Sequence, residues 1–256
     1  MNLIAVDVGN STIHIGFFSK SGLILQKIDT LPLKTPGEYK SIFKVLISEN
    51  FVEKNTTGVI ISSVVPGHNE ILRETLKELL SVEPLMVSCK IKTGLTFRIP
   101  NPEGLGSDRI ANAVAVYERY KCPVAVVDFG TTTTISVVAR DAEYIGGAIM
   151  PGIRLMNESL AKGTSKLSEV PLTPPGSALG PDTVQCIQSG LFYGTAGAIE
   201  RLLSEIEKEI GFELKVVLTG GYGYMISKFL KRNYDLLIPD LTIEGLKLLY
   251  TRNMDV

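Results

Sequence analysis

The hydrophobic positions in the first half of the chain alternate between short β-rich runs and segments with helical spacing. Within residues 68–81, apolar side chains such as Leu72, Leu76 and Leu79 recur at the spacing that lines one face of a helix. The predicted elements of this half are strands at 2–7, 13–18, 23–28 and 58–65 and helices at 37–50, 68–81 and 107–120. Such an alternation is typical of an α/β protein.

The second half of the chain begins the same pattern again. The elements predicted there are strands at 123–128, 134–139, 143–149 and 215–218 and one long helix at 183–210. Gly211 is expected to end the helix, and a proline-rich loop at 170–181 precedes it.

One short sequence occurs in both halves. Residues 3–12 read LIAVDVGNST and residues 124–133 read VAVVDFGTTT, each an apolar strand that ends in Asp-x-Gly before small polar residues. The second copy begins close to the midpoint of the 256-residue chain. We therefore predict two duplicated domains, at residues 1–115 and 116–256.

Composition excludes several classes of function. The chain has 26 basic and 27 acidic residues, so no overall field attracts nucleic acid or an anionic membrane. Its 2 histidines argue against a His-rich zinc site, and its 3 cysteines form no paired motif. The N-terminus has no basic n-region, and no apolar run approaches the ~20 residues of a membrane helix. We expect a cytoplasmic protein without nucleic-acid or membrane partners.

The repeated Asp-x-Gly sequence has the chemistry of a phosphate site. A strand places the Asp at its carboxyl end, where open α/β sheets bind ligands. The glycine permits a tight turn and a close approach of the ligand to the backbone. Exposed N–H groups and hydroxyls then form an anion cradle, and the carboxylate can hold a cation directly or through water. One copy alone would favour a plain hairpin turn, whereas two copies favour phosphate binding.

Paired Asp-x-Gly loops followed by a Gly-Gly loop resemble the acetate kinase, hexokinase, Hsp70 and actin superfamily. This resemblance implies two RNase H-like domains with ATP in a cleft between them. The loops for terminal phosphates, for phosphate with metal, and for adenosine would be Asp7–His14, Asp128–Thr133 and Leu218–Gly223. The chain lacks the pattern G-x-x-x-x-G-K-[ST], which disfavours a P-loop kinase.

A closer resemblance, over essentially the whole chain, is to the type III pantothenate kinase family. That family carries, in order, D-x-G-N-[ST], G-A-D-R at a helix start, D-x-G-T-A-T-T, G-G-x-I-x-P-G and a threonine-led helix. The similar segments here begin at Asp7, Gly106, Asp128, Gly146 and Thr183. The activity implied is ATP-dependent phosphorylation of pantothenate to 4′-phosphopantothenate, the first step of coenzyme A synthesis.

The resemblance also assigns roles to individual residues. It implies ATP contacts at Asp7, Val8, Gly9, Asn10, Ser11, Thr12, Ile13, His14 and Thr131. It implies substrate contacts at Gly106, Ser107, Asp108, Arg109 and Thr183. Asp108 would be the general base, and Asp128 would hold a monovalent cation, potassium or ammonium. Mg²⁺ would accompany ATP, and members of the family are typically homodimers.

The residue types at the predicted helix start agree with these roles. The helix dipole favours an Asp108 anion, so we expect a carboxylate that is ionised at neutral pH and can accept a hydroxyl proton. Arg109 offers a planar fork for a carboxylate, which pantothenate carries. Taken alone, the pair would be a capping aspartate beside a solvated arginine. Gly146-Gly147, taken alone, could simply bend a strand.

Three positions depart from the family pattern. Ser107 and Thr132 replace alanines, and Ile99 stands where many members have a tyrosine that lines the substrate pocket. Ile99 leaves open a kinase for a different small hydroxy acid. A Baf-type transcriptional regulator is another alternative, but near-neutral charge and the lack of a recognisable helix-turn-helix argue against direct DNA binding.

Overall fold

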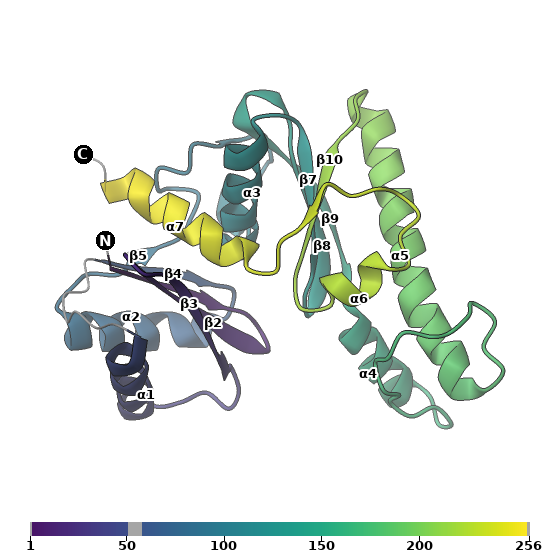
Figure 1. Cartoon of the computed structure of the whole chain (residues 1–256), viewed down its shortest axis with the longest axis horizontal. Helices are drawn as coiled ribbons and strands as arrows, with labels where there is room; N and C mark the ends of the chain where they lie inside the picture. Colours follow the sequence, from purple (N-terminus) through teal and green to yellow (C-terminus); the bar gives the residue numbers. More distant parts are fainter. Residues whose placement is uncertain (1, 51–57, 255–256) are drawn as a thin grey trace. The chain divides into compact units, whose positions relative to one another are not determined.

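The chain folds around two β-sheets in a computed structural model that describes residues 2–50 and 58–254 (Figure 1). The chain divides into two compact units. Unit 1 comprises Met1–Arg119 with Leu241–Val256, and unit 2 comprises Tyr120–Asp240. The mixture of strands and helices in both units confirms the predicted α/β class.

Unit 1 contains a five-stranded sheet in the order β3-β2-β1-β4-β5. Strands β1, β2 and β3 pair antiparallel, whereas β4 and β5 extend the sheet parallel to β1. The strands are β1 (Leu3–Val8), β2 (Thr12–Ser19), β3 (Gly22–Asp29), β4 (Gly58–Ser63) and β5 (Leu85–Met86), and a further short strand of this unit is β6 (Thr96–Phe97).

Helices cover both faces of the unit 1 sheet, because successive strand residues point to opposite sides. Ile4 and Val6 of β1 belong to a core cluster with residues of α1 and α2. Leu3 and Ala5 belong to a second cluster with residues of α3 and α7. The helices of this unit are α1 (Pro36–Asn50), α2 (Pro66–Leu80), η1 (Pro102–Gly104), α3 (Ser107–Tyr120) and α7 (Leu241–Met254).

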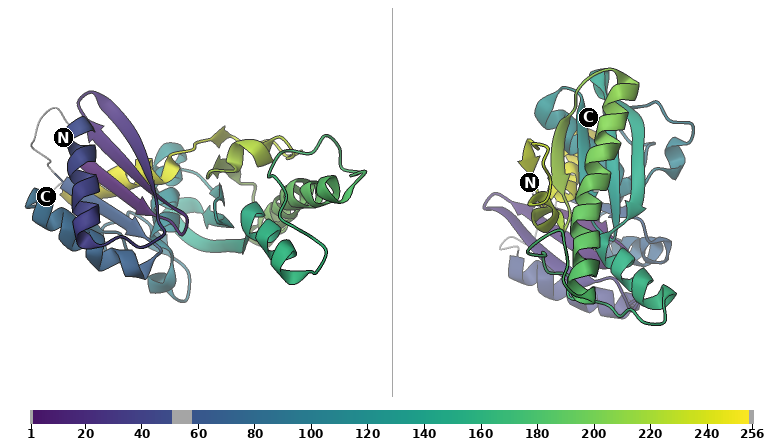
Figure 2. Two further views of the ribbon diagram at one scale, coloured as in Figure 1. Left: turned by 90° about the horizontal axis from the view of Figure 1, so that it is seen from below. Right: turned by 90° about the vertical axis from the view of Figure 1, so that its right-hand side faces the viewer.

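Unit 2 repeats this arrangement. Its strands follow the order β11-β10-β7-β8-β9, which matches β5-β4-β1-β2-β3 of unit 1 strand for strand. The strands are β7 (Val124–Phe129), β8 (Thr132–Val138), β9 (Glu143–Pro151), β10 (Lys215–Thr219) and β11 (Leu236–Leu237). The helices are η2 (Arg140–Ala142), α4 (Ile153–Gly163), α5 (Thr183–Ile210) and α6 (Gly223–Ser227), and the long α5 lies along one face of the sheet (Figure 2). The predicted duplication is confirmed.

The last helix of the chain belongs to unit 1, whereas the sequence led us to place residues 116–256 in one domain. Leu246 and Leu249 of α7 are fully buried in the same cluster as Leu3 and Ile60 of the unit 1 sheet. The helix covers a sheet face that would otherwise expose these side chains. Among the described residues, none of the helices has the length and apolar character needed to span a bilayer.

Candidate active site

The predicted ATP loop, Asp7–His14, is the hairpin between β1 and β2. Its turn is closed by the Gly9 N–H, which donates to the Thr12 carbonyl at 3.1 Å. The side chains of Val8 and Ile13 are fully buried, so only the backbone of these two residues can face a ligand. Asn10 and Ser11 are exposed at the tip, and Asp7, Gly9, Thr12 and His14 are half-buried. The hairpin thus presents polar groups at the carboxyl end of β1.

Thr30, which the sequence motifs did not reveal, fixes this hairpin. Its hydroxyl donates to the Gly9 carbonyl at 2.7 Å, and its N–H donates to the Ser11 carbonyl at 3.2 Å. The Thr30 carbonyl lies 3.1 Å from Nε2 of His68, which must carry a proton to donate to it. Thr30 and His68 are both buried. A residue just after β3 therefore sets the geometry of the loop.

Two serines link Asp7 to the start of α3. Ser62 lies beside Asp7 in the parallel pairing of β4 with β1, and its hydroxyl donates to Asp7 Oδ1 at 2.8 Å. Ser62 Oγ is 3.0 Å from Ser107 Oγ, which also accepts the Ser63 N–H at 2.9 Å. Ser107 immediately precedes Asp108. Unit 1 therefore joins the predicted phosphate loop and the predicted catalytic segment in one hydrogen-bonded network.

Asp108 is the second residue of α3, and its Oδ1 accepts the Arg109 N–H at 2.7 Å. Gly106 leaves room for this carboxylate, because a Cβ at position 106 would lie only 2.5 Å from the same oxygen. Burial raises the pKa of Asp108 above its ordinary value, although the backbone hydrogen bond and charge of Arg109 act in the opposite direction. Desolvation of the carboxylate is the larger effect, so the pKa is raised even at a helix start, where the dipole favours the anion.

The remaining predicted substrate contact, Thr183, is the exposed first residue of α5 in unit 2. The helix is capped by Asp182, whose carboxylate accepts the Gln185 N–H at 2.8 Å. Gly211 ends the helix in a left-handed conformation with φ 76°, as predicted.

The second Asp-x-Gly sequence forms the turn between β7 and β8 in unit 2. Asp128 pairs with Thr219 of the parallel strand β10, so their carboxyl ends meet at one edge of the sheet. Gly220 has φ +89° and lies so near that a Cβ there would be 2.4 Å from Asp128 Oδ1. The Gly152 N–H donates to the Thr131 carbonyl at 3.0 Å. Unit 2 therefore brings together the second loop, the Gly-Gly loop and the end of the segment 146–152.

Gly146 and Gly147 shape β9. Their φ values are 123° and 153°, and a Cβ at Gly147 would collide with the Ile135 carbonyl oxygen at 1.9 Å. The pairing register of β8 with β9 shifts between Val137 and Val138. The two glycines thus allow an irregularity in the strand, the structural role that their sequence alone also suggested.

The donors in both loops suit hard cations. Asp7 and Asp128 are half-buried carboxylates next to backbone and hydroxyl oxygens. Within residues 2–50 and 58–254, no group of 3 or more His, Cys, Asp or Glu side chains forms a ready-made metal site. Mg²⁺ is commonly held by one or two carboxylates together with water and phosphate oxygens. These loops therefore fit a cation that arrives with a nucleotide.

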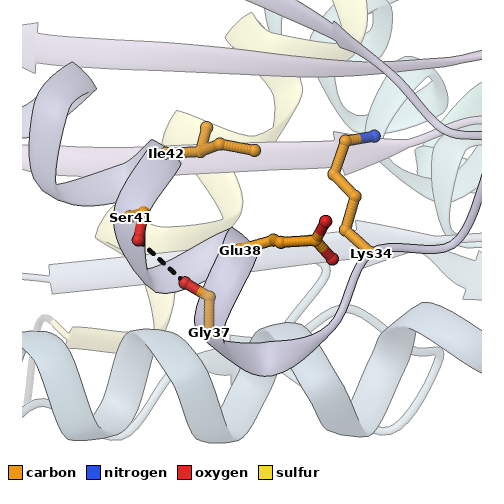
Figure 3. A pocket seen from close by; sticks show the side chains of 5 residues that line it. All are labelled: Lys34, Gly37, Glu38, Ser41 and Ile42. Atoms are coloured by element: carbon orange, nitrogen blue, oxygen red, sulfur yellow. Dashed lines mark hydrogen bonds between the residues drawn. The ribbon is translucent and has the colours of Figure 1, made fainter.

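An open hollow at the start of α1 has a different role. Its lining consists of Lys34, Gly37, Glu38, Ser41 and Ile42 (Figure 3). The Glu38 carboxylate accepts the N–H and the hydroxyl of Thr35 at 2.7 and 2.8 Å. The Ser41 hydroxyl donates to the Gly37 carbonyl at 3.0 Å. Thr35 and Glu38 form a capping box, so these polar groups stabilise the N-terminus of α1.

Comparison with known proteins gives one family. A family model described as type III pantothenate kinase matches residues 3–205. A type III pantothenate kinase of Moorella thermoacetica is 38% identical over 253 residues, covering 98% of this chain and 99% of the relative. One from Agathobacter rectalis is 38% identical, covering 98% and 97%, and one from Myxococcus xanthus is 36% identical, covering 98% of each.

Solved structures share the fold at much lower sequence identity. The activator of the 2-hydroxyisocaproyl-CoA dehydratase from Clostridium difficile, with bound ADPNP, has a TM-score of 0.55 and 12% identity, covering 98% of this chain and 94% of that chain. A ROK family glucokinase from Streptomyces griseus, in complex with glucose and AMPPNP, has a TM-score of 0.53 and 13% identity, covering 98% and 100%. These likenesses confirm the predicted fold class of duplicated RNase H-like domains.

Proposed function

The chain belongs to the type III pantothenate kinase family, and on this premise we propose that it transfers the γ-phosphoryl group of ATP to the hydroxyl group of pantothenate. The products are 4′-phosphopantothenate and ADP, and the reaction is the first step of coenzyme A synthesis. One observation carries this proposal: relatives named type III pantothenate kinase are 36–38% identical over 98% of the chain.

Asp108 is the general base in this proposal. Its ionised carboxylate accepts the proton of the pantothenate hydroxyl while the hydroxyl oxygen attacks the γ-phosphorus and ADP leaves. Burial supports this role, because it raises the pKa of Asp108 and so strengthens the carboxylate as a proton acceptor. The hydrogen bond from the Arg109 N–H orients the carboxylate.

The ATP phosphates are bound by the hairpin Asp7–His14 and by Thr131. The closed turn at Gly9 and the exposed tip of the hairpin support this assignment, because backbone N–H groups of such turns bind anions. Bound Mg²⁺ would supply neutralisation of the phosphate charge, and the Asp7 carboxylate is the residue of this loop that would hold it.

Pantothenate is recognised through its own carboxylate in this proposal. The Arg109 guanidinium offers a planar pair of donors to that group, and Gly106, Ser107 and Thr183 complete the contacts. Asp128 would hold the monovalent cation, potassium or ammonium, with oxygen donors of the second loop.

The decisive experiment measures ADP release from Mg-ATP with and without pantothenate, in potassium buffer and again in sodium buffer. Turnover that requires pantothenate and potassium is the expected result. Turnover that is equal in both buffers would overturn the cation assignment alone. A folded protein that binds ATP but releases no ADP with pantothenate would overturn the proposed substrate.

Ile99 makes a substrate panel informative. This residue is half-buried and stands where the family pattern has a tyrosine. Pantothenate should give the highest kcat/KM among small hydroxy acids tested with ATP. A higher kcat/KM for another acid would replace pantothenate as the substrate while leaving the kinase assignment in place.

The family resemblance also supports a homodimer. Light scattering of the purified protein should then give twice the chain mass of 27.8 kDa, and the mass of a single chain would overturn this proposal.

A further inference from the structure

A short series of buried hydroxyl groups connects the carboxylate of Asp7 to the start of α3. The Ser62 hydroxyl donates to Asp7 Oδ1 at 2.8 Å and lies 3.0 Å from Ser107 Oγ. Ser107 Oγ accepts the Ser63 N–H at 2.9 Å and lies 3.1 Å from the Ser63 carbonyl. Ser62 is 0% exposed and Ser107 is 7% exposed, so water does not replace these contacts.

The protons available on these groups determine which hydroxyl donates to which acceptor. An ionised carboxylate only accepts hydrogen bonds, so the single hydroxyl proton of Ser62 goes to Asp7. Ser62 Oγ can then only accept from Ser107, whose own proton goes to Ser62 Oγ or to the Ser63 carbonyl. In either arrangement Ser107 is held by the end of β4, because the Ser63 N–H has its partner in Ser107 Oγ. Removing Ser107 Oγ would leave that N–H without this acceptor.

Asp108 follows Ser107 directly and has little freedom of its own. Its Oδ1 is held by the Arg109 N–H at 2.7 Å. On the other side, a Cβ added to Gly106 would lie 2.5 Å from Oδ1, which shows how closely backbone and carboxylate pack there. A shift of the Ser107 backbone therefore moves the Asp108 carboxylate with it.

We propose that Ser107 and Ser62 are positioning residues for the phosphoryl transfer, and that they fix the Asp108 carboxylate relative to the Asp7 carboxylate. This inference rests on the proposed function, because it takes Asp7 as a phosphate-loop residue and Asp108 as the base. The hydroxyl of Ser107 then acts through its neighbour, because its partners are Ser62 and the backbone of Ser63, and the proposed contact of Ser107 with pantothenate is made by its backbone. Since small displacements of a catalytic group reduce the rate strongly, loss of this hydroxyl lowers kcat.

The test is a double-mutant cycle that combines Ser107→Ala with Asp108→Asn. Ser107→Ala alone should lower kcat by roughly 10-fold, because a misplaced base loses part of its effect. In the Asp108→Asn background the same change should alter kcat by less than about 2-fold, because the base it positions is already removed. Ser107→Thr keeps a hydroxyl and should recover most of the lost activity.

Ser136→Ala is the matched control. Ser136 is also a buried serine, 2% exposed, and its hydroxyl oxygen accepts from the Tyr144 hydroxyl at 3.4 Å within the sheet of unit 2. This variant should lose thermal stability like Ser107→Ala but keep kcat within about 2-fold of the wild type. A kcat of Ser107→Ala within that same range, or additive effects of Ser107→Ala and Asp108→Asn, would overturn the proposal.

The Ser62 contact is tested by ATP affinity, which needs no turnover. Calorimetry should show that Ser62→Ala weakens ATP binding roughly 5-fold or more, because Asp7 loses its hydrogen-bond donor. An unchanged affinity would overturn this part. Should Ser62→Ala not fold, Ser62→Thr, which keeps the hydroxyl, should bind ATP normally while Ser107→Ala carries the kinetic test. Failure of the proposed function appears separately, as wild-type protein that binds ATP without pantothenate-dependent ADP release.

Discussion

Replacing Asp108 by Asn should abolish most catalysis while leaving the fold intact. The two side chains have nearly the same shape, and an Asn Oδ1 can still accept the Arg109 N–H that now lies 2.7 Å from the carboxylate. The close approach of Gly106 is also preserved. An amide cannot accept the hydroxyl proton, so kcat should fall roughly 10²–10⁴-fold. That factor corresponds to about 2.7–5.5 kcal/mol of lost transition-state stabilisation.

The same substitution should raise stability at neutral pH. Burial raises the pKa of Asp108 in the folded protein, so the fold favours the protonated carboxyl. A carboxyl with a raised pKa contributes stability below its unfolded pKa and loses that contribution as pH rises through the folded pKa. Ionisation of this buried carboxyl therefore costs stability in the wild type, and Asn, which cannot ionise, removes that cost. The gain should shrink as pH falls towards about 4, the ordinary pKa of an aspartate.

Two measurements check this prediction on the same samples. Initial rates of ADP release at saturating pantothenate and ATP give kcat, and thermal unfolding from pH 8 to pH 4 gives the difference in Tm. Asp141→Asn is the matched control, because it makes the same chemical change at an exposed residue and should alter neither quantity. A kcat within tenfold of the wild type would contradict the role of Asp108 as general base, and a neutral-pH Tm well below that of the wild type would contradict the cost of its burial.

Three further substitutions test the loop, unit 2 and the last helix. Thr30→Val removes the hydroxyl that donates to Gly9, so KM for ATP should rise roughly 5–10-fold in steady-state assays while Thr30→Ser stays near the wild type. Glu207→Gln weakens the bidentate interaction in which the Arg232 guanidinium donates to both carboxylate oxygens of Glu207, at 2.7 and 2.6 Å. It should lower the free energy of unfolding by about 1–2 kcal/mol at pH 7. Because Arg232 lowers the pKa of Glu207, that stabilisation is present above the unfolded pKa near 4.5 and is lost as pH falls through the folded pKa, so urea titrations should show the deficit disappear in acid. Leu249→Ala leaves a cavity under α7 and should lower the unfolding free energy in urea by about 2–5 kcal/mol, whereas a loss below 1 kcal/mol would contradict the packing of this helix in unit 1.

The elements that the sequence predicted best are those whose pattern is local. The helix expected at 107–120 is α3, and the helix expected at 183–210 is α5. Helix α7 was not predicted, and its Gly245 shows why a local pattern fails there. Glycine lowers helix propensity, yet a Cβ at Gly245 would lie 2.1 Å from the Ala111 carbonyl oxygen of α3. The residue that weakens the helical signal is the one that the contact between two helices requires.

The candidate site likewise has parts that the local sequence predicts and parts that it does not. Both Asp-x-Gly turns could be predicted, because strand, carboxylate and glycine are adjacent in the chain. Thr30 and Ser62 could not be, since they lie 21 residues from Gly9 and 55 residues from Asp7 in sequence. The raised pKa of Asp108 also escaped prediction, because the helix dipole is a local effect whereas desolvation depends on the packed neighbours.

The two copies of the Asp-x-Gly hairpin have diverged in the hydroxyl that lies beside each aspartate. Ser62 of β4 pairs with Asp7 of β1, and at the equivalent position in unit 2 Thr219 of β10 pairs with Asp128 of β7. The Ser62 hydroxyl donates to Asp7, whereas the Thr219 hydroxyl lies 3.4 Å from the Pro239 carbonyl, to which it donates. Asp128 is instead approached by the backbone of Gly220. A carboxylate that is oriented by a hydroxyl donor suits a fixed place beside phosphates. In the roles proposed above, Asp7 lies beside phosphates and Asp128 holds a monovalent cation, and this divergence agrees with the proposal that one duplicated motif has two different tasks.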